Sequence, residues 1–485
     1  MGSSLLATDG YKFSMAEAGW PLREETFYYT HRRGGAQLLP FDVEAVVRGL
    51  LPVAKVEDYA YLAAHEYEMG AGFKAAICGG ASVVVRAIPK GSWFLPREPV
   101  FSVTGPSALV SWLEPLLLQL HFRIQVATVA KTDRGALEEA VRVATCERHK
   151  EIVLETLDAV GERAPRIAVD ADAYRARVAA SARELGGIAG PGRIFEVGLR
   201  SATSIEQHLI ALEGCRDAGV RRTSHVLGAR LLGMTPVGTM GHEHVQRYGS
   251  DDAAFRAMRE RRPQRSSYLL DTFDTMRSGL PAAFALLREH GPGDSIRYDS
   301  GDKEAQYRYA TALAAEHAVR PVHILEDSFD APLTRRFEAL RAELGVRPEE
   351  QHYGYGGALV ASTAGNPFTR DRVSAVYKLS RSGRRATMKF GNEADAGKES
   401  VPGDPVVFRR VSGDGPVGLI GQCGEAPPPG YVLLTRSRGD ATGEAGEAAR
   451  GAAAGPATVE ATPATRALAA RLRAELAATI EGGAP

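Results

Sequence analysis

The sequence has few cysteines and no excess of either charge, and both absences exclude classes of protein. Its 485 residues include four cysteines, at positions 78, 146, 215 and 423, and no two of them form a Cys-x-x-Cys pair. A disulfide framework and a cysteine zinc site are therefore not expected, and a reducing compartment is favoured. Lysine and arginine together number 59, as do aspartate and glutamate. No general attraction to nucleic acid or to an anionic membrane is expected from this balance.

Long uninterrupted apolar runs are also absent. The opening residues, MGSSLLATDGYKF, lack a basic region followed by a long apolar core, so a signal peptide is not expected. The most apolar stretch, ALVSWLEPLLLQLHFRIQVATVA, contains Glu114, Pro115 and Arg123, and it predicts a buried helix rather than a membrane span. We therefore expect a cytoplasmic protein with no membrane partner.

The middle of the chain alternates between short apolar runs and helical patterns. Hydrophobic residues make up 44% of the sequence and charged residues 24%, as in ordinary globular proteins with a large core. Six apolar runs each lead into a helical segment, at residues 193–199, 234–240, 266–275, 295–301, 320–328 and 351–360. This alternation is typical of parallel βα repeats. It favours an irregular (β/α) barrel, and an open doubly wound sheet is the alternative.

The segments on either side of these repeats differ from them. The first part mixes short strands and helices, and strand-like runs return after the repeats, so we expect an α/β domain built from both. A stretch rich in Ala, Gly and Glu then predicts a flexible linker before an amphipathic helix. The predicted domains are an N-terminal segment, the barrel, a returning segment, the linker and the helix: 1–115, 116–360, 361–435, 436–462 and 463–485.

Polar residues lie at the carboxyl end of almost every predicted strand. In a barrel these strand ends meet at one mouth, where ligands bind. Residues far apart in the sequence are therefore expected to share one pocket. The residues in question are Arg200, Thr239, His242, Asp271, Asp274, Asp299, Gly301, Asp302, Glu326, Asp327, Gly356 and Gly357.

Two acidic motifs have both a functional and a structural interpretation. In RYDSGD, Asp302 is suited to cap the helix that follows, whereas Asp299, with Arg297 two residues before it, suits sugar hydroxyls or a magnesium-bound phosphate. In DTFDT, Asp271 and Asp274 could cap a helix, bind magnesium through water or hold ribose hydroxyls. Two acid clusters on neighbouring strands together favour a site.

Histidines, glycines and arginines in three further motifs suit the binding or transfer of phosphate. In GTMGHEH, His242 and His244 lack a third soft ligand for zinc, so the alternatives are ordinary packing or, beside phosphates, a phosphate-accepting nucleophile. The glycines of YGYGGALV expose backbone amides that suit a phosphate. Arg32, Arg33 and Arg370 are ordinary surface charges unless a diphosphorylated ligand is present.

Taken in order, the motifs resemble the nicotinate phosphoribosyltransferase family. The resemblance extends from about residue 8 to residue 410, and it depends on the ordered set rather than on any one motif. The motifs are TDGYKFSMAEA, FEVGLRSA, RRTSHVLGARLLGMTPVGTMGHEH, LLDTFDT, RYDSGD, EDSFD, YGYGGALV, VYKL and GKESVPGDPVVFRR.

The resemblance implies a reaction, a fold and an assembly. The family forms nicotinate mononucleotide and pyrophosphate from nicotinate and phosphoribosyl pyrophosphate with Mg²⁺, and ATP hydrolysis drives turnover through a phosphohistidine. Its fold is an irregular α/β barrel beside an α/β domain built from both chain ends. A head-to-tail homodimer or a higher homo-oligomer, with the site between subunits, is therefore expected.

The resemblance also assigns roles to single residues. His242 matches the phosphorylated histidine, Arg200 the arginine that holds the pyridine carboxylate, and Tyr11 a tyrosine that stacks on the pyridine across the dimer interface. Ser224 matches a serine of the acid-using members, where amide-using relatives carry aspartate. Positions facing the ribose, magnesium pyrophosphate or phosphates are Asp271, Asp299, Gly301, Gly356, Gly357, Arg370 and, from the partner subunit, Arg32 or Arg33. Asp271 and Asp299 are the expected metal ligands, and Thr239, Arg297 and Asp327 are further expected substrate contacts.

One departure from the family leaves alternatives open. The family usually carries phenylalanine, which stacks on the pyridine, where this chain has Val197. Nicotinamide is therefore a rival substrate, and a non-catalytic protein that binds phosphoribosyl pyrophosphate or a pyridine is a rival function. The acid clusters alone would also suit a metal-dependent barrel lyase. A decarboxylating quinolinate enzyme is disfavoured, because the tract carrying His242 is foreign to that relative.

Overall fold

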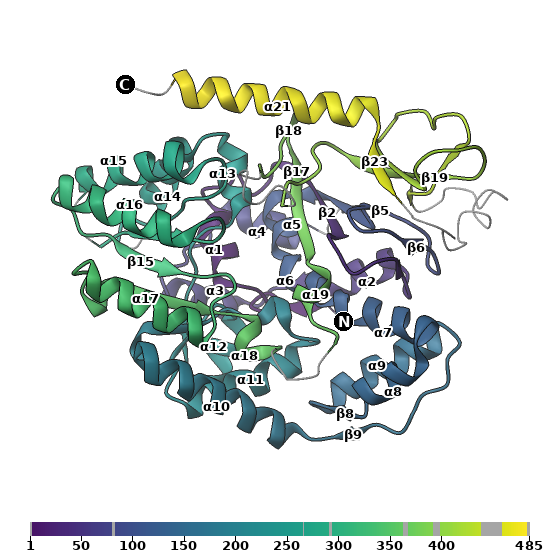
Figure 1. Ribbon diagram of the computed structural model, residues 1–485, viewed down its shortest axis with the longest axis horizontal. Helices are drawn as coiled ribbons and strands as arrows, with labels where there is room; N and C mark the ends of the chain where they lie inside the picture. The colour runs from purple at the N-terminus through teal and green to yellow at the C-terminus, as the bar shows by residue number, and fades with distance from the viewer. Residues whose placement is uncertain are drawn as a thin grey trace.

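The protein is a mixed α/β structure with two principal sheets, seen in a computed structural model (Figure 1). The larger sheet has seven strands and the second has six. The structure describes residues 2–79, 83–264, 266–290, 293–361, 367–390, 398–437 and 458–482. Most of the predicted linker lies outside these residues.

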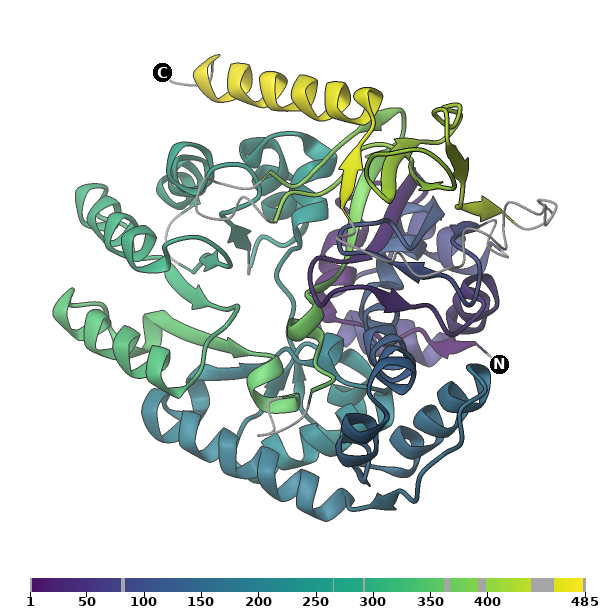
Figure 2. The ribbon, with the colours of Figure 1, turned by 45° about the vertical axis from the view of Figure 1, so that its right-hand side comes forward.

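The seven-stranded sheet is parallel throughout and strongly curled (Figure 2). Its spatial order is β12-β11-β10-β16-β15-β14-β13, so the last strand in sequence pairs with the first. Among the described residues, no ladder joins the two edge strands, β12 and β13. The strands are β10 (Ile194–Glu196), β11 (Arg222–Thr223), β12 (Thr235–Pro236), β13 (Ser267–Leu269), β14 (Ser295–Tyr298), β15 (Val322–Leu325) and β16 (Gln351–Tyr355).

Helices follow the strands and cover the convex face of this curled sheet (Figure 2). Apart from the helix at 242–248, whose buried residues are mostly polar, they present apolar faces to the strands, as parallel sheets require, because both faces of such a sheet are buried. The helices are α11 (Ile205–Asp217), α12 (Val226–Leu232), α13 (His242–Tyr248), α14 (Asp251–Arg261), α15 (Leu280–His290), α16 (Lys303–Glu316) and α17 (Ala331–Glu343). The predicted mixed α/β class with curled parallel repeats is confirmed, with one strand more than the six predicted.

Helix α1 (Gly10–Ala16) packs beside the open edge of the curled sheet, and all of its residues are buried. The hydroxyl of Ser14 donates a hydrogen bond of 2.6 Å to the Thr239 carbonyl, just past β12. A Cβ at Gly238 would lie 2.3 Å from the Gly10 carbonyl carbon, so only glycine permits this approach. An N-terminal helix therefore lies where the strand ladder stops.

The six-stranded sheet joins the beginning of the chain to its later part. Its order is β18-β17-β2-β7-β5-β22, and β17 pairs antiparallel with β2. Apolar side chains from both parts of the chain, among them Phe27, Leu113 and Leu379, share one core cluster. The strands are β2 (Glu24–His31), β5 (Val84–Ala87), β7 (Phe101–Pro106), β17 (Ala375–Ser382), β18 (Arg385–Ala386) and β22 (Arg436–Ser437).

The apolar stretch at 108–130 forms three successive helices rather than one. These are α5 (Ser107–Trp112), α6 (Glu114–Leu118) and α7 (Leu120–Thr132). From α7 onward the chain forms a helical lobe with its own small core, which includes Phe122, Val153 and Leu157. Within the part of the chain that the structure describes, no helix has the length and apolar character needed to cross a bilayer.

A small four-stranded sheet and a long helix complete the described chain. The sheet has the order β21-β19-β20-β23, from β19 (Pro405–Arg410), β20 (Gly418–Gln422), β21 (Tyr431–Leu433) and β23 (Val459–Ala461). The last helix, α21 (Pro463–Gly482), lies along the outside of the molecule in both views (Figures 1 and 2). It occupies the segment for which an amphipathic helix was predicted. The predicted domain boundaries themselves stay a prediction.

Candidate functional site

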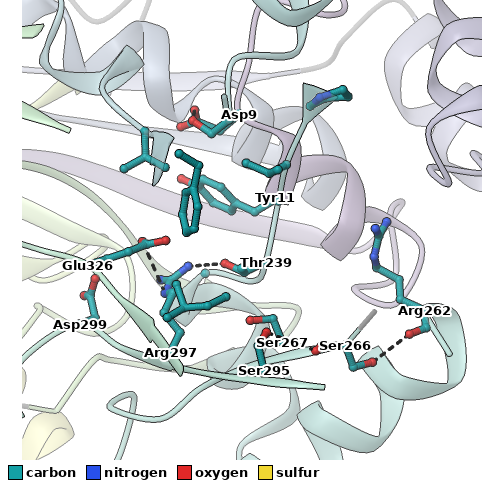
Figure 3. Close-up of a pocket in the computed structure, with 18 of the residues that line it drawn as sticks. Asp9, Tyr11, Thr239, Arg262, Ser266, Ser267, Ser295, Arg297, Asp299 and Glu326 are labelled. Carbon is teal, nitrogen blue, oxygen red and sulfur yellow. Dashed lines mark hydrogen bonds and ion pairs between the residues drawn. The ribbon is translucent and has the colours of Figure 1, made fainter. Parts of the chain in front are cut away.

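A cavity of about 580 Å³ lies on the concave side of the curled sheet (Figure 3). Loops that follow the strands and the start of α1 surround it, as strand-end convergence predicts. The predicted residues that line it are Tyr11, Arg200, Ser224, Thr239, His242, Arg297 and Asp299. Residues far apart in the sequence thus share one pocket.

His242, at the start of α13, is the centre of a buried polar cluster. Its Nδ1 lies 3.0 Å from the Thr272 hydroxyl, and its Nε2 lies 3.2 Å from an Asp299 carboxylate oxygen. The ammonium group of Lys389 donates to the same Nε2 at 3.0 Å and to Asp271 at 3.0 Å. The two carboxylates and the imidazole each place a ligand atom within 4.8 Å of the others.

The charges of this cluster stabilise one another. Burial, and after it the charge of Lys389, lower the pKa of His242 to about 4. Burial alone would raise the pKa of Asp299 and of Asp271. The contact with His242 and the charge of Arg297 nevertheless hold the pKa of Asp299 well below its usual range, and Lys389 and His242 lower that of Asp271. At neutral pH both carboxylates of the cluster are therefore ionised and the imidazole is neutral.

The two acidic motifs separate into site residues and helix caps. Asp299 and Asp271 belong to the cluster, whereas Asp302 accepts from the Ala305 amide at 3.0 Å and Asp274 from the Arg277 amide at 2.8 Å. Both capping interpretations are thus confirmed for the second acid of each motif. Gly301, between Asp299 and Asp302, has φ of 83°, a conformation that favours glycine.

Arg297 crosses the inside of the curled sheet from β14 (Figure 3). One guanidinium nitrogen donates to the Thr239 hydroxyl, and Nε lies 3.7 Å from Glu326. Burial raises the pKa of Glu326, although the charge of Arg297 opposes the shift. Arg297 therefore links β14, the end of β15 and the segment after β12, across the open edge of the sheet.

The other end of the cavity presents an arginine, a tyrosine and several acids. The Arg200 guanidinium lies 5.8 Å from the centre of the Tyr11 ring, 3.7 Å from Asp9 and 3.9 Å from Glu114. The Tyr11 hydroxyl donates to Glu114 at 2.6 Å. This geometry suits a flat ring with a polar substituent, held between Tyr11 and Arg200.

Ser224 lies beside a carboxylate that the sequence interpretation did not include. Its hydroxyl donates to Asp9 Oδ1 at 2.6 Å, while Asp9 Oδ2 is buried without a hydrogen-bond partner. Burial raises the pKa of Asp9, and Arg200 opposes the shift. The corner beside Ser224 therefore does contain an acidic group, because Asp9 supplies a carboxyl group there.

A second cavity, of about 480 Å³, adjoins the first and is rich in basic side chains. The two cavities share Arg200, His242, Asp299 and Lys378. The predicted residues that line only the second are Arg32, Arg33, Asp327, Gly356, Gly357 and Arg370. Glycine backbone and basic groups thus meet where a phosphorylated ligand was predicted.

A single chain brings Tyr11, Arg32 and Arg33 to these cavities. Their predicted origin in a second subunit is not needed to complete the lining described here, and an oligomeric site stays a prediction. Asp271 and Gly301 do not line either cavity in the described part of the chain. The Asp271 carboxylate instead contacts Lys389 and His242, which line the cavities.

The loop after β15 has an unusual backbone. Asp327 and Ser328 have φ of 56° and 63°, which non-glycine residues rarely adopt and which cluster at functional sites. Lys303 donates to the Asp327 carbonyl at 2.7 Å, and the Lys398 ammonium lies 3.6 Å from its carboxylate. The loop therefore presents Asp327 at the wall of the second cavity.

Sequence reasoning missed three lysines. Lys378, in VYKL on β17, lines both cavities, and burial together with the charge of Lys389 lowers its pKa to about 7. Lys389 and Lys398 follow β18 and line the second cavity. The signals in the sequence were Lys378 in VYKL and Lys398 in GKESVPGDPVVFRR, and a lysine in such a segment is ordinary by itself. His244, by contrast, bonds the Ala254 carbonyl at 2.9 Å, as the packing interpretation predicted.

No family model matches the chain. Among curated proteins it is similar to nicotinate phosphoribosyltransferases from Bacillus subtilis (26% identity, 49% of this chain and 48% of that protein) and Bos taurus (25%, 75% and 66%). One from Mycobacterium tuberculosis is 29% identical over 53% of this chain and 52% of its own. The matched part spans about half to two thirds of the length of these relatives.

Two solved structures show the same fold. Nicotinate phosphoribosyltransferase from Porphyromonas gingivalis superposes with a TM-score of 0.58 at 17% identity, over 82% of this chain and 96% of its own. The Vibrio cholerae protein gives 0.54 at 17% identity, over 82% and 90%.

Fold and site together give an α/β protein whose curled parallel sheet joins an acid–histidine–lysine cluster to a cavity rich in basic side chains. The curated proteins to which the chain is similar are nicotinate phosphoribosyltransferases, the family that its motifs resemble.

Proposed function

We propose that the chain is a nicotinate phosphoribosyltransferase of NAD salvage, forming nicotinate mononucleotide and pyrophosphate from nicotinate and phosphoribosyl pyrophosphate. The observation that carries this proposal is the pair of adjoining cavities, which share Arg200, His242 and Asp299. One end suits a flat acidic ring and the other suits phosphates.

The end of the cavity with Tyr11 and Arg200 suits a pyridine carboxylate. The Arg200 guanidinium offers a charge-assisted contact to the carboxylate, and the Tyr11 ring, 5.8 Å from that guanidinium, offers one stacking face. The pyridine nitrogen is itself the nucleophile, so no protein base is required and positioning is the main task of these residues.

The acids and cations suit the charges that develop during transfer. As the bond from ribose C1 to pyrophosphate breaks, the sugar gains positive character and the leaving group gains negative charge. Asp299 stays ionised because its pKa is lowered, so it can stabilise the sugar. Arg370, Lys378 and Lys398 line the leaving-group end and stabilise the pyrophosphate.

Asp271 and Asp299 fit Mg²⁺ as expected ligands. Both offer hard carboxylate oxygens, and Asp271 Oδ1 is buried without a hydrogen-bond partner. A bound Mg²⁺ would neutralise charge on the pyrophosphate. The protein's own share is to hold these oxygens, through Lys389 and Ser300 on the Asp271 carboxylate.

His242 is the proposed acceptor of the γ-phosphoryl group of ATP. With its proton on Nδ1, toward Thr272, the neutral imidazole keeps a lone pair on Nε2, which accepts from Lys389 at 3.0 Å until a phosphoryl group takes its place. The N–P bond forms as the bond from the γ-phosphorus to its bridging oxygen breaks, and ADP leaves. Water then hydrolyses the N–P bond, which releases inorganic phosphate, restores the imidazole and couples ATP to turnover.

A cytoplasmic homo-oligomer, head-to-tail as in the family, completes the proposal. The deciding experiment is pyrophosphate release by the purified chain with nicotinate and phosphoribosyl pyrophosphate, with and without ATP. We expect release with nicotinate and stimulation by ATP. Binding of phosphoribosyl pyrophosphate without release would instead favour the non-catalytic alternative.

Nicotinamide is the second candidate base, and one observation favours it. Asp9 Oδ2 has no hydrogen-bond partner and lies 3.7 Å from the Arg200 guanidinium, and it could accept a hydrogen bond from the amide of nicotinamide, which the carboxylate of nicotinate cannot donate. Comparing kcat/KM for the two bases separates the candidates. A higher value for nicotinamide would overturn the assignment of the acid.

A further inference from the structure

The C-terminal helix α21 contacts a segment that walls the second cavity. This segment, residues 398–404, is called the wall segment below. The Arg473 guanidinium forms a two-point ion pair with Glu399, at 2.5 and 3.3 Å. Gly403 approaches the helix so closely that a Cβ there would lie 3.1 Å from the Leu468 side chain, and its φ of 83° also requires glycine.

Other contacts fix the helix against the wall segment and the curled sheet. The Gln422 amide donates to the Thr465 hydroxyl at 3.0 Å and to the Pro402 carbonyl at 3.1 Å. Leu472 is 5% exposed, and Leu476 packs against the core of the curled sheet. The helix therefore has an apolar anchor as well as the ion pair.

The wall segment in turn holds three basic groups at the phosphate end. Its Lys398 carbonyl accepts from the Arg32 guanidinium at 2.8 Å, and the Lys398 ammonium lies 3.6 Å from Asp327. Ser400 donates its amide to the Lys389 carbonyl at 3.1 Å, and its hydroxyl accepts from the Lys389 amide at 2.8 Å.

We propose that α21 is a positioning element for the phosphate end of the site. Through Arg473 and Glu399 it holds the wall segment, and so Arg32, Lys389 and Lys398, where a diphosphate binds. The helix lies outside the motifs of the family resemblance, and none of its residues lines either cavity in the described chain. Its effect is on phosphates and not on the base, because the Tyr11–Arg200 end makes no contact with the wall segment in the interactions described above. The proposal rests on the proposed function of the site.

The test is Arg473→Glu, which places a carboxylate against Glu399, compared with Arg471→Glu as a matched control. Among the residues that the structure describes, Arg471 pairs only with Glu475 within the helix, at 3.6 Å, and it receives the same change of charge. For Arg473→Glu we expect a roughly 5–20-fold rise in the KM for phosphoribosyl pyrophosphate, with the KM for nicotinate within twofold of wild type, as loss of a positioned ionic contact predicts. Arg471→Glu should leave both unchanged.

A charge-swapped double variant separates positioning from damage. Arg473→Glu combined with Glu399→Arg restores the ion pair with its sign reversed, and it should recover most of the KM for phosphoribosyl pyrophosphate. Equal losses in Arg473→Glu and Arg471→Glu, or no recovery in the double variant, would overturn the proposal.

A second readout does not depend on activity. Acylation of Lys398, followed by mass spectrometry, should be faster in Arg473→Glu than in wild type or Arg471→Glu, and the affinity for magnesium pyrophosphate should be lower. If wild type releases no pyrophosphate from nicotinate, the proposed function fails, and these two measurements alone decide the role of the helix. Unchanged labelling together with unchanged pyrophosphate affinity would contradict it.

Discussion

The ammonium group of Lys389 lies 3.0 Å from a carboxylate oxygen of Asp271, although the two residues follow strands of different sheets. Lys389 comes after β18 of the antiparallel sheet and Asp271 after β13 of the curled sheet. The cation that keeps the Asp271 carboxyl ionised thus comes from the neighbouring sheet. The polar cluster exists only where these two sheets pack together.

Replacing His242 with alanine is expected to abolish ATP hydrolysis and the stimulation by ATP. Slow transfer of the base should remain, because the ribose- and base-binding groups are intact. ADP release and pyrophosphate release, measured on the same samples, check this. His290→Ala, on α15, is the control and should behave as wild type, and ATP hydrolysis that persists in His242→Ala would refute the phosphohistidine.

Replacing Asp299 with asparagine is expected to lower kcat about 100-fold, the size typical for loss of a fixed group that stabilises transition-state charge. The KM for nicotinate should change much less, because Asp299 faces the sugar. Steady-state kinetics with both substrates check this. Asp302→Asn, which keeps a capping side chain on α16, serves as the control. A loss confined to base affinity would contradict the role given to Asp299.

Replacing Ser224 with aspartate is expected to lower kcat/KM for nicotinate by about tenfold or more and for nicotinamide by less. The new carboxylate would lie beside Asp9, 2.6 Å from the present hydroxyl, and would repel an acidic base. The ratio of the two kcat/KM values is the measurement, with Ser224→Ala as the uncharged control. An unchanged ratio would show that Ser224 does not select the base.

Affinity for pyrophosphate is expected to fall as pH rises from 6 to 8.5. Burial and the charges of Lys389 and Arg32 lower the pKa of Lys378 to about 7, so Lys378 is charged below this pH and neutral above it. A charge-assisted contact is worth about 1.5–3 kcal/mol, which predicts a roughly tenfold or greater loss. Titration calorimetry at several pH values checks this, and Lys378→Arg should flatten the profile. A flat wild-type profile would argue against the shifted lysine.

Mild acid is expected to destabilise wild type more than a His323→Gln variant. Burial lowers the pKa of His323 to about 4, below its ordinary value near 6.5. Between these values the unfolded chain binds a proton that the folded chain does not, so stability is lost as pH falls from 6.5 toward 4. The difference approaches roughly 3 kcal/mol. Urea unfolding of both proteins at pH 7, 5.5 and 4.5 measures it, and parallel pH profiles would contradict the shift.

Part of this site could be predicted from the sequence because a polar residue directly after an apolar run marks the carboxyl end of a strand. Asp299, Asp271 and His242 follow apolar runs directly, and parallel topology brings such positions together. The second acid of each motif, Asp302 or Asp274, capped a helix, as residue type and position allowed.

The rest depended on packing that no local pattern encodes. Lys378 lies on β17 of the antiparallel sheet and Lys389 follows β18. Both face the acids of the curled sheet only because the two sheets pack together. β11 has two residues, too few for a periodicity. Asp9 is two positions before Tyr11 in the sequence, yet its contact with Ser224 spans 215 positions.

The interruption between β12 and β13 has a consequence for biosynthesis. Helix α1 is made among the first residues, yet its partner Thr239 lies 225 positions beyond Ser14. This contact must therefore wait until about half of the chain has been made, a long-range closure of the kind that slows folding. An extension placed directly before α1 would hinder this late step, whereas the same extension after α21 would leave it free.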